Sequence, residues 1–367
     1  IGHLRNFVLG VALEHILKAG GKRLHPISYV NDVGSNVAKC LWLLVKKADV
    51  SLKELTEDHV HMILERVPKE QRNGKFLGHV YTEVTALVEA DEKAKEEISF
   101  VQAQLEAHVT AWDRLWQETR RWCIDELLSI FEELGIRVER QYFESEVIDE
   151  AGPIVDTLLQ KGVATKSQGA IIVDLEEQKL GVMMIRKSDG NLLYASKDIP
   201  LALRKIKEYP ATTHSYVLVD YRQTLYFKQL AAVLKLLEVK PLIDLIGYGL
   251  VTLPEGAMSS RKGNIVTYQG LRDAVMDYAR QEVIARHPDW TEGKVSHTAW
   301  ALAMGGIKFA LLRQDSEKDI VFDMKEALSF DGATGPYCQY AATRFGSILR
   351  KAEFPADATT KSLVPVF

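Results

Sequence analysis

The chain has 367 residues, of which 47% are hydrophobic and 26% are charged, proportions typical of an ordinary globular protein with room for roughly two or three domains. Its net charge is -4, so no global excess of positive charge indicates nucleic acid, although a local basic stretch can still bind phosphates. The longest apolar stretches are well short of the roughly 18 residues that a membrane span needs. Three widely spaced cysteines contain no C-x-x-C pair. We therefore expect no membrane association, no tightly bound metal and a reducing, cytoplasmic setting.

The first part of the chain predicts a helix followed by a strand. Apolar residues recur at helical spacing between positions 4 and 17, and Gly20 with Gly21 ends the pattern as a helix C-cap does. The strand-like segment 27–34 carries Asn31 and Asp32 near its end. Open α/β sheets bind ligands at the carboxyl ends of their strands, so these two residues are site candidates.

From residue 35 to residue 134 the sequence is charged and helix-prone, with few prolines or glycines. Segments 83–108 and 110–133 carry apolar residues at helical spacing on highly charged backgrounds, which predicts a helical insertion. Three tryptophans of this region are expected to pack between helices rather than to stack on nucleobases: Trp112, Trp116 and Trp122.

The α/β pattern returns at about residue 135. The alternating segment 135–142 predicts a strand that delivers Glu144 to its end, and segments 169–174 and 181–186 predict a hairpin. Further strands are predicted at 192–194 and 216–219, and helices at 148–161, 199–209, 224–237, 271–285, 297–312 and 335–351.

A short loop, Gly256–Gly263, has a composition that suits a phosphate. Its glycines allow a tight turn, Ser259 and Ser260 offer hydroxyl donors, and Arg261 with Lys262 supplies positive charge. On these residues alone, a basic surface turn is the commoner explanation.

Polar residues cluster at predicted strand ends, in positions from which they can share one pocket. Tyr194 and Asp198 are four residues apart, and together with Glu144 they would form a pocket of two carboxylates and one aromatic wall. Such a pocket complements a guanidinium group. The alternative is that the acids form surface salt bridges with nearby basic residues: Arg186, Lys187 or Lys197.

On these residues together, the chain resembles the arginyl-tRNA synthetases, which are class I aminoacyl-tRNA synthetases, over nearly its whole length. Six segments match in order: Ile1-Gly2-His3-Leu4-Arg5-Asn6, Phe143-Glu144-Ser145, Tyr194-Ala195-Ser196-Lys197-Asp198, Arg222-Gln223, Met258–Gly263, and the segment from Leu328 to Tyr340. The resemblance implies activation of arginine by ATP and its transfer to tRNA(Arg), with tRNA required for the activation step.

The resemblance also implies an α/β fold and a division into domains. Residues 1–34 and 135–285 would form the two halves of a Rossmann-type catalytic domain, the second half including connective hairpins and the Met258–Gly263 loop. Residues 35–134 would be a helical insertion, and 286–367 a helical region leading into a truncated all-α anticodon-binding domain. Because the sequence begins inside a motif and without Met, we expect a fragment of a longer protein, acting as a monomer.

Roles for individual residues follow from the resemblance. Its implied ATP-binding residues are Gly2, His3, Met258, Ser259 and Ser260, and its catalytic residues are His3, Arg261 and Lys262. The implied arginine-binding residues are Asn31, Glu144, Tyr194, Asp198 and Gln223. Magnesium is expected with ATP, as part of the substrate complex.

The loop departs from the family pattern at two positions. Ala257 and Ser260 stand where the signature has lysines, so Arg261, Lys262 or a lysine outside this sequence would have to supply the charge. Two alternative functions stay open. One is another class I synthetase or nucleotidyltransferase, which would lack the guanidinium pocket, and the other is a non-catalytic module that binds tRNA or protein.

Overall fold

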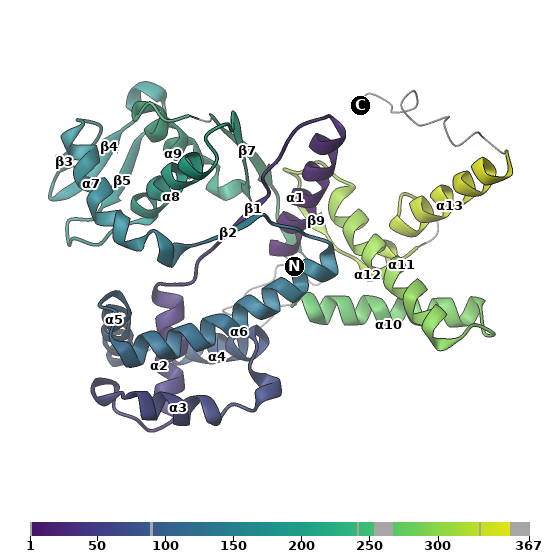
Figure 1. The fold of residues 1–367 in the computed structure, drawn as a ribbon, viewed down its shortest axis with the longest axis horizontal. Helices are drawn as coiled ribbons and strands as arrows, with labels where there is room; N and C mark the ends of the chain where they lie inside the picture. Colours follow the sequence, from purple (N-terminus) through teal and green to yellow (C-terminus); the bar gives the residue numbers. More distant parts are fainter. Residues whose placement is uncertain (1, 89–90, 241, 253–266, 330–331, 353–367) are drawn as a thin grey trace. The chain divides into compact units, whose positions relative to one another are not determined.

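A computed structural model describes residues 2–88, 91–240, 242–252, 267–329 and 332–352 (Figure 1). The chain divides into two compact units, which we describe separately. The larger unit comprises residues 10–248. The smaller unit combines residues 2–9 and 249–252 with the described residues from 267 onward.

Two pairs of parallel strands lie in the larger unit. Strand β1 (Ile27–Val30) pairs with β2 (Arg140–Phe143), and β6 (His214–Asp220) pairs with β7 (Leu242–Tyr248). The strand predicted at 135–142 is shorter than expected and begins only at Arg140. It cannot begin at Gly135, because this residue adopts a left-handed conformation (φ 70°) as the C-cap of the preceding helix. A one-to-one register sets Val30 opposite Phe143, so both strands end at the same edge.

An antiparallel sheet and three helices complete the α/β part of this unit. Strands β3 (Thr165–Ser167), β4 (Ala170–Asp174) and β5 (Val182–Arg186) form the predicted hairpin with one added strand. The helices are α7 (Ala151–Gln160), α8 (Tyr194–Glu208) and α9 (Thr224–Leu236). Short 3-10 turns occupy Leu52–Glu54, Lys69–Gln71, Glu144–Glu146, Ile148–Glu150, Glu176–Gln178 and Tyr221–Gln223.

The predicted strand 192–194 is wrong. Leu192 makes only a single bridge to Arg186, and α8 already begins at Tyr194. A helical hydrogen bond from Ser196 N to Leu193 O, 3.0 Å long, starts the helix before Pro200. Proline does not mark the helix start here, and α8 is one continuous helix where the sequence predicted a strand followed by a later helix.

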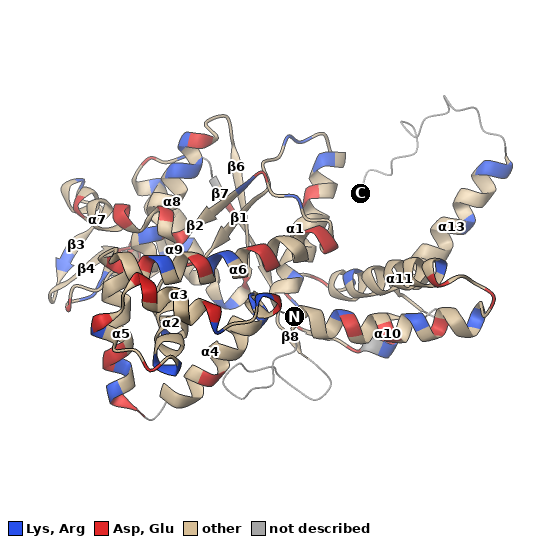
Figure 2. Ribbon diagram, turned by 60° about the horizontal axis from the view of Figure 1, so that its bottom comes forward, with Lys and Arg blue, Asp and Glu red and all other residues tan. Residues whose placement is uncertain are grey.

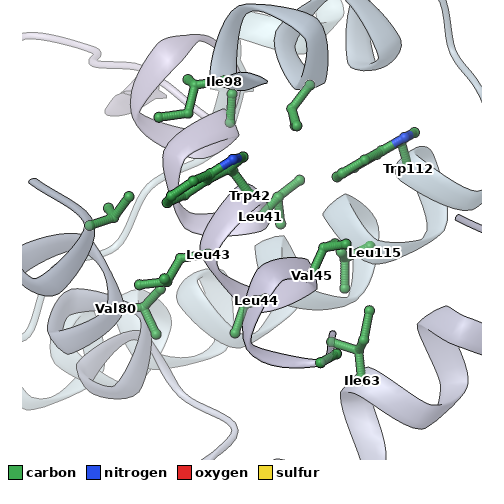
Figure 3. Close-up of a cluster of buried hydrophobic side chains, with 14 of the residues drawn as sticks. Leu41, Trp42, Leu43, Leu44, Val45, Ile63, Val80, Ile98, Trp112 and Leu115 are labelled. Atoms are coloured by element: carbon green, nitrogen blue, oxygen red, sulfur yellow. The ribbon is translucent and has the colours of Figure 1, made fainter. Parts of the chain in front are cut away.

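Helices α2 (Ser35–Lys47), α3 (Glu57–Glu65), α4 (Gly74–Val88), α5 (Glu92–Glu106) and α6 (Thr110–Leu134) cover the range predicted to be helical (Figure 1). The segment 83–108 is not one helix, because Asp91 caps a new helix by accepting a hydrogen bond from Ala94 N at 3.2 Å. Apolar side chains of α2 pack against the other helices in one core (Figure 3). Trp112 and Trp122 are 2% and 5% exposed, so their predicted packing role is confirmed.

The smaller unit is mainly helical, with α10 (Tyr268–Arg286), α11 (Glu292–Leu312), α12 (Met324–Ala327) and α13 (Gly335–Lys351) beside a short parallel pair, β8 (Val251–Thr252) and β9 (Ile320–Val321). Helix α1 (Gly2–Ala19) begins in this unit. The predicted bounds of α13 are confirmed. A Cβ atom on Gly335 would lie 2.5 Å from Gly305 O, so glycine is needed where α13 meets α11.

Helix α11 is long and apolar enough to cross a membrane by length and composition, and it is the one such helix among the described residues. Its buried residues recur at helical spacing, as in the core helix of a folded domain: Val295, Ala299, Ala303, Ile307 and Leu311. Its neighbour α10 carries basic and acidic residues interspersed along its length (Figure 2).

Candidate active site

The ends of β1 and β2 bring together two of the predicted site residues. Because Val30 lies opposite Phe143, the residues that follow, Asn31 and Glu144, become neighbours. Asn31 Nδ2 donates a hydrogen bond to Glu144 Oε2 at 2.5 Å. Glu144 is only 3% exposed, so this carboxylate belongs to a buried site rather than to the surface.

Glu144 also forms an ion pair with Lys197 of α8. The sequence suggested such a pair as the alternative to a substrate site, but placed it on the surface. Here the lysine side chain is 19% exposed and the carboxylate 4%, so the pair is largely buried. A buried carboxylate needs a cation nearby, and Lys197 provides it.

Asp198 occupies the first turns of α8 and accepts a hydrogen bond from the Tyr226 hydroxyl of α9. Burial raises the pKa of Asp198 above its ordinary value. Burial and then the charge of Asp198 raise the pKa of Tyr226, so this hydroxyl stays protonated and acts as a donor.

Tyr29 belongs to the same polar group. Its pKa is raised by burial and then by the charges of Asp198 and Glu144, which places the ring within the field of both acids. The sequence analysis missed Tyr29 and Tyr226. A signal for Tyr29 was available, because residues 29 and 31 of a strand lie on the same face.

A partly buried lysine, Lys205, lies farther along α8, within the electrostatic reach of Asp198. Burial lowers the pKa of Lys205, while attraction to Asp198 opposes this shift. Two lysines thus accompany the two acids predicted to bind substrate: Lys197 pairs with Glu144, and Lys205 is attracted to Asp198.

The other two predicted arginine-binding residues, Tyr194 and Gln223, are more exposed than the two acids. Tyr194 lies one turn before Asp198 on α8 and is 70% exposed. Gln223 is exposed in the turn before α9. Within the described part of the chain, its side chain makes no hydrogen bond to Glu144 or Asp198.

A second hydrogen-bond network involves Asp32 and Ser145, the residues that directly follow Asn31 and Glu144 in the sequence. Asp32 accepts hydrogen bonds from Ser145 N at 2.9 Å and from Ser145 Oγ at 2.7 Å. It also accepts one from Arg120 Nε of α6 at 2.6 Å, while its backbone oxygen accepts one from the Trp116 indole at 2.7 Å. This network fixes α6 to the edge where β1 and β2 end.

Gly2 and His3 form the first turn of α1, in the smaller unit, and both are exposed. Arg5, one turn later, is fully buried and donates to Gly249 O and Lys318 O at 2.7 Å each and to Asp315 O at 3.2 Å. Three backbone carbonyls of other segments thus hold the start of α1 in place within this unit. The sequence matched Arg5 to the family without assigning it a role.

Five predicted site residues lie outside the described residues: Met258, Ser259, Ser260, Arg261 and Lys262. Across the part of the chain that is described, no group of three or more His, Cys, Asp or Glu side chains is arranged to hold a metal ion. Acidic side chains with basic and tyrosine partners suit an organic cation better than a metal.

Comparisons with known proteins identify the family of this chain. Residues 1–324 match the family described as tRNA synthetases class I (R), catalytic domain. An arginine–tRNA ligase of Bdellovibrio bacteriovorus is 36% identical over 370 residues, covering 98% of this chain and 60% of that protein. An arginine–tRNA ligase of Treponema denticola is 31% identical over 364 residues, covering 96% of this chain and 58% of that protein. The chain thus spans about three fifths of the length of these relatives.

Solved structures show the same fold. The arginyl-tRNA synthetase of Plasmodium falciparum superposes with a TM-score of 0.76 at 19% identity, covering 98% of this chain and 58% of that one. The arginyl-tRNA synthetase of Thermus thermophilus gives a TM-score of 0.65 at 23% identity, covering 98% of this chain and 64% of that one. The predicted α/β class I synthetase fold is thereby confirmed. Since the family match extends over most of its residues, the chain belongs to the class I tRNA synthetases (R).

Proposed function

We propose that this chain is the catalytic part of an arginine–tRNA ligase, which activates arginine with ATP and transfers it to the 3′ end of tRNA(Arg). One observation supports this proposal more strongly than any other. A buried carboxylate, Glu144, and a partly buried one, Asp198, lie with tyrosines at the carboxyl edge of the β1–β2 pair and the start of α8. The names of the curated relatives support the choice of arginine.

The pocket favours a guanidinium group over an ammonium group for a geometric reason. A guanidinium presents five N–H donors in one plane and can engage two carboxylates at once, whereas an ammonium group presents three donors from one point. In the proposed complex the guanidinium takes the place of Lys197 at Glu144 and also pairs with Asp198. Tyr226 holds the Asp198 carboxylate in position, and the exposed ring of Tyr194 covers the substrate.

The proposed reaction has two steps. A carboxylate oxygen of arginine attacks the α-phosphorus of ATP in line, and pyrophosphate leaves as arginyl-adenylate forms. A ribose hydroxyl at the 3′ end of tRNA then attacks the activated carbonyl carbon, and AMP leaves. No covalent enzyme intermediate is needed, so the protein positions the reactants and stabilises charge.

We assign the phosphate-handling roles as the family resemblance implies them. Gly2 allows the nucleotide to approach α1, and His3 stabilises charge on the phosphates. Magnesium accompanies ATP and neutralises phosphate oxygens. We further propose that residues 1–34 and 135–285 make up the catalytic domain, and that the enzyme works as a cytoplasmic monomer.

Calorimetric titration of the purified chain with three amino acids tests the substrate assignment. L-arginine should bind, while L-citrulline, the neutral analogue of the same shape, and L-lysine should each bind at least about 30-fold more weakly. Citrulline supplies no cation to the carboxylates, and the ammonium group of lysine cannot engage both carboxylates at once. Equal binding of citrulline and arginine would exclude a carboxylate-lined guanidinium pocket.

A further inference from the structure

The two acids proposed to hold the guanidinium come from different elements of the larger unit. Glu144 is the first residue of the 3-10 turn that follows β2, and Asp198 belongs to α8. A guanidinium can pair with both carboxylates only if their separation matches it, and binding groups of this kind must be held to within about 0.5 Å. The contacts that hold this turn against α8 therefore determine how well the pocket fits arginine.

Glu146, the last residue of the same turn, binds two arginines from different elements. Arg140 of β2 engages both of its carboxylate oxygens, with Nη1 3.2 Å from Oε1 and Nη2 2.6 Å from Oε2. Arg204 of α8 donates to Oε2 at 3.3 Å. Glu146 thus links β2 to α8 from within the turn that carries Glu144.

The same two arginines extend the link along α8. Arg204 Nη2 also donates to Glu150 in the next 3-10 turn, and Arg140 Nε lies 3.6 Å from Glu208 Oε2 near the end of α8. The fully buried Tyr142 of β2 donates to that same oxygen at 2.6 Å. The network therefore holds α8 at two positions one turn apart, which fixes the rotation of the helix as well as its place.

This network is of the kind that can define geometry. Isolated ion pairs on a surface contribute little, but here one pair is bidentate, three of the charges are shared and the side chains are partly buried. An apolar cluster of Tyr142, Val147 and Leu201 packs the same elements together. Apolar contacts are non-directional, whereas the planar forks of arginine accept few orientations, so the ion pairs define the alignment.

We propose that Glu146 and Arg204 are positioning residues of the arginine site, which set the separation of the Glu144 and Asp198 carboxylates by holding the turn against α8. This inference rests on the proposed function, because it takes arginine as the substrate. Both residues act through the two acids and not on the substrate itself. Their loss should therefore reduce the preference for arginine over lysine.

Calorimetric titration of the 367-residue chain with L-arginine tests the proposal, with the affinity for L-lysine obtained by competition. Glu146→Gln keeps the size of the side chain but removes the charge that two arginines share, and Arg204→Met keeps the apolar stem but removes the fork. Each should weaken arginine binding about tenfold or more. Lysine binding should change by less than about twofold, because an ammonium group presents its donors from one point and does not depend on the separation of two acids.

Glu97→Gln is the matched control for the acid. Its carboxylate is 22% exposed, against 24% for Glu146, and it also has two partners, the Trp42 indole at 2.8 Å and Lys46 at 3.2 Å. Arg72→Met is the control for the arginine, since Arg72 is likewise partly buried in an ion pair. Both controls should lower the melting temperature and yet bind arginine as the unchanged protein does.

Arginine affinity unaltered in folded Glu146→Gln and in folded Arg204→Met would overturn the proposal. Equal losses of affinity for arginine and for lysine would also overturn it, because a general distortion of the site would weaken both ligands. The proposed function fails separately, by an absence of arginine binding in the unchanged protein.

Discussion

Lys197 of α8 is the cation that pairs with Glu144, at a place where the two side chains are 19% and 4% exposed. The proposed substrate must take this place with its guanidinium. In the ion pair, Lys197 neutralises the charge of Glu144. Removing the lysine therefore tests whether the guanidinium of arginine binds at Glu144.

Replacing Lys197 with methionine keeps the apolar stem and leaves Glu144 without its cation. A buried charge that loses its partner costs about 3 kcal/mol or more, so the melting temperature without arginine should fall by several degrees. Added arginine should restore the missing cation. The gain in melting temperature on adding saturating arginine should therefore be larger in Lys197→Met than in the unchanged protein.

Lys47→Met is the control, because Lys47 pairs with Glu83 where both side chains are about half exposed. Its arginine-induced gain should equal that of the unchanged protein. If Lys197→Met gained no more from arginine than this control, the guanidinium would not lie beside Glu144.

Asp198→Asn should weaken arginine binding and, at the same time, stabilise the folded protein. Loss of one carboxylate should weaken arginine binding roughly 30-fold or more, as measured by calorimetry. The same change should stabilise the folded protein at neutral pH. The pKa of Asp198 is raised by burial above its ordinary value of 3.8, so the folded protein holds the proton more tightly than the unfolded chain does. The ionised carboxylate therefore destabilises the fold as the pH rises above 3.8, and asparagine removes this effect.

The stability difference should disappear in melting curves taken below pH 3.8, where Asp198 is protonated in both states. Asp220→Asn serves as the opposite case, because the hydrogen bond from Arg222 lowers the pKa of Asp220. That variant should lose stability at neutral pH, and its difference should shrink as the pH falls. A lower melting temperature for Asp198→Asn at pH 7 would refute this account of the aspartate.

Arg5→Met should destabilise the smaller unit. The arginine donates to three backbone carbonyls, and hydrogen bonds from a charged donor contribute about 1.5–3 kcal/mol each, so a loss of at least about 3 kcal/mol is expected in denaturant unfolding. Gly249→Ala should also destabilise, since its Cβ would lie 2.5 Å from the Lys318 carbonyl. The control is Arg23→Met, at an exposed position, which should change the free energy of unfolding by less than about 0.5 kcal/mol. If Arg23→Met lost as much stability as Arg5→Met, the buried hydrogen bonds of Arg5 would not be the cause.

Local pattern predicted much of this fold. The bounds of α13 were predicted to the residue, because Thr334 accepts a hydrogen bond from Tyr337 N as N-cap and Gly335 with Pro336 opens the helix. The approach of Asn31 to Glu144 was foreseeable, since both follow strands of one parallel pair. Tyr194 was predicted to end a strand because the helix was predicted to begin only at Ile199, whereas α8 begins at Tyr194.

The remaining contacts follow from tertiary structure and have no periodic signal. Asp198 and Tyr226 are 28 residues apart, Asp32 and Arg120 are 88 apart, and Arg5 and Gly249 are 244 apart. The choice between a substrate site and an ion pair at Glu144 could not be made from sequence either. It depends on burial, which the spacing of residues does not reveal.

Arginine-dependent exchange of pyrophosphate into ATP is the most direct test of the central claim, that this chain activates arginine. The assay would compare arginine, lysine and cysteine, each with and without tRNA(Arg), in the unchanged protein and in Asp198→Asn. We predict exchange with arginine alone among the three amino acids, stimulated by tRNA and strongly reduced in Asp198→Asn. Exchange with lysine or cysteine but not arginine, or no arginine-dependent exchange under either condition, would contradict the account.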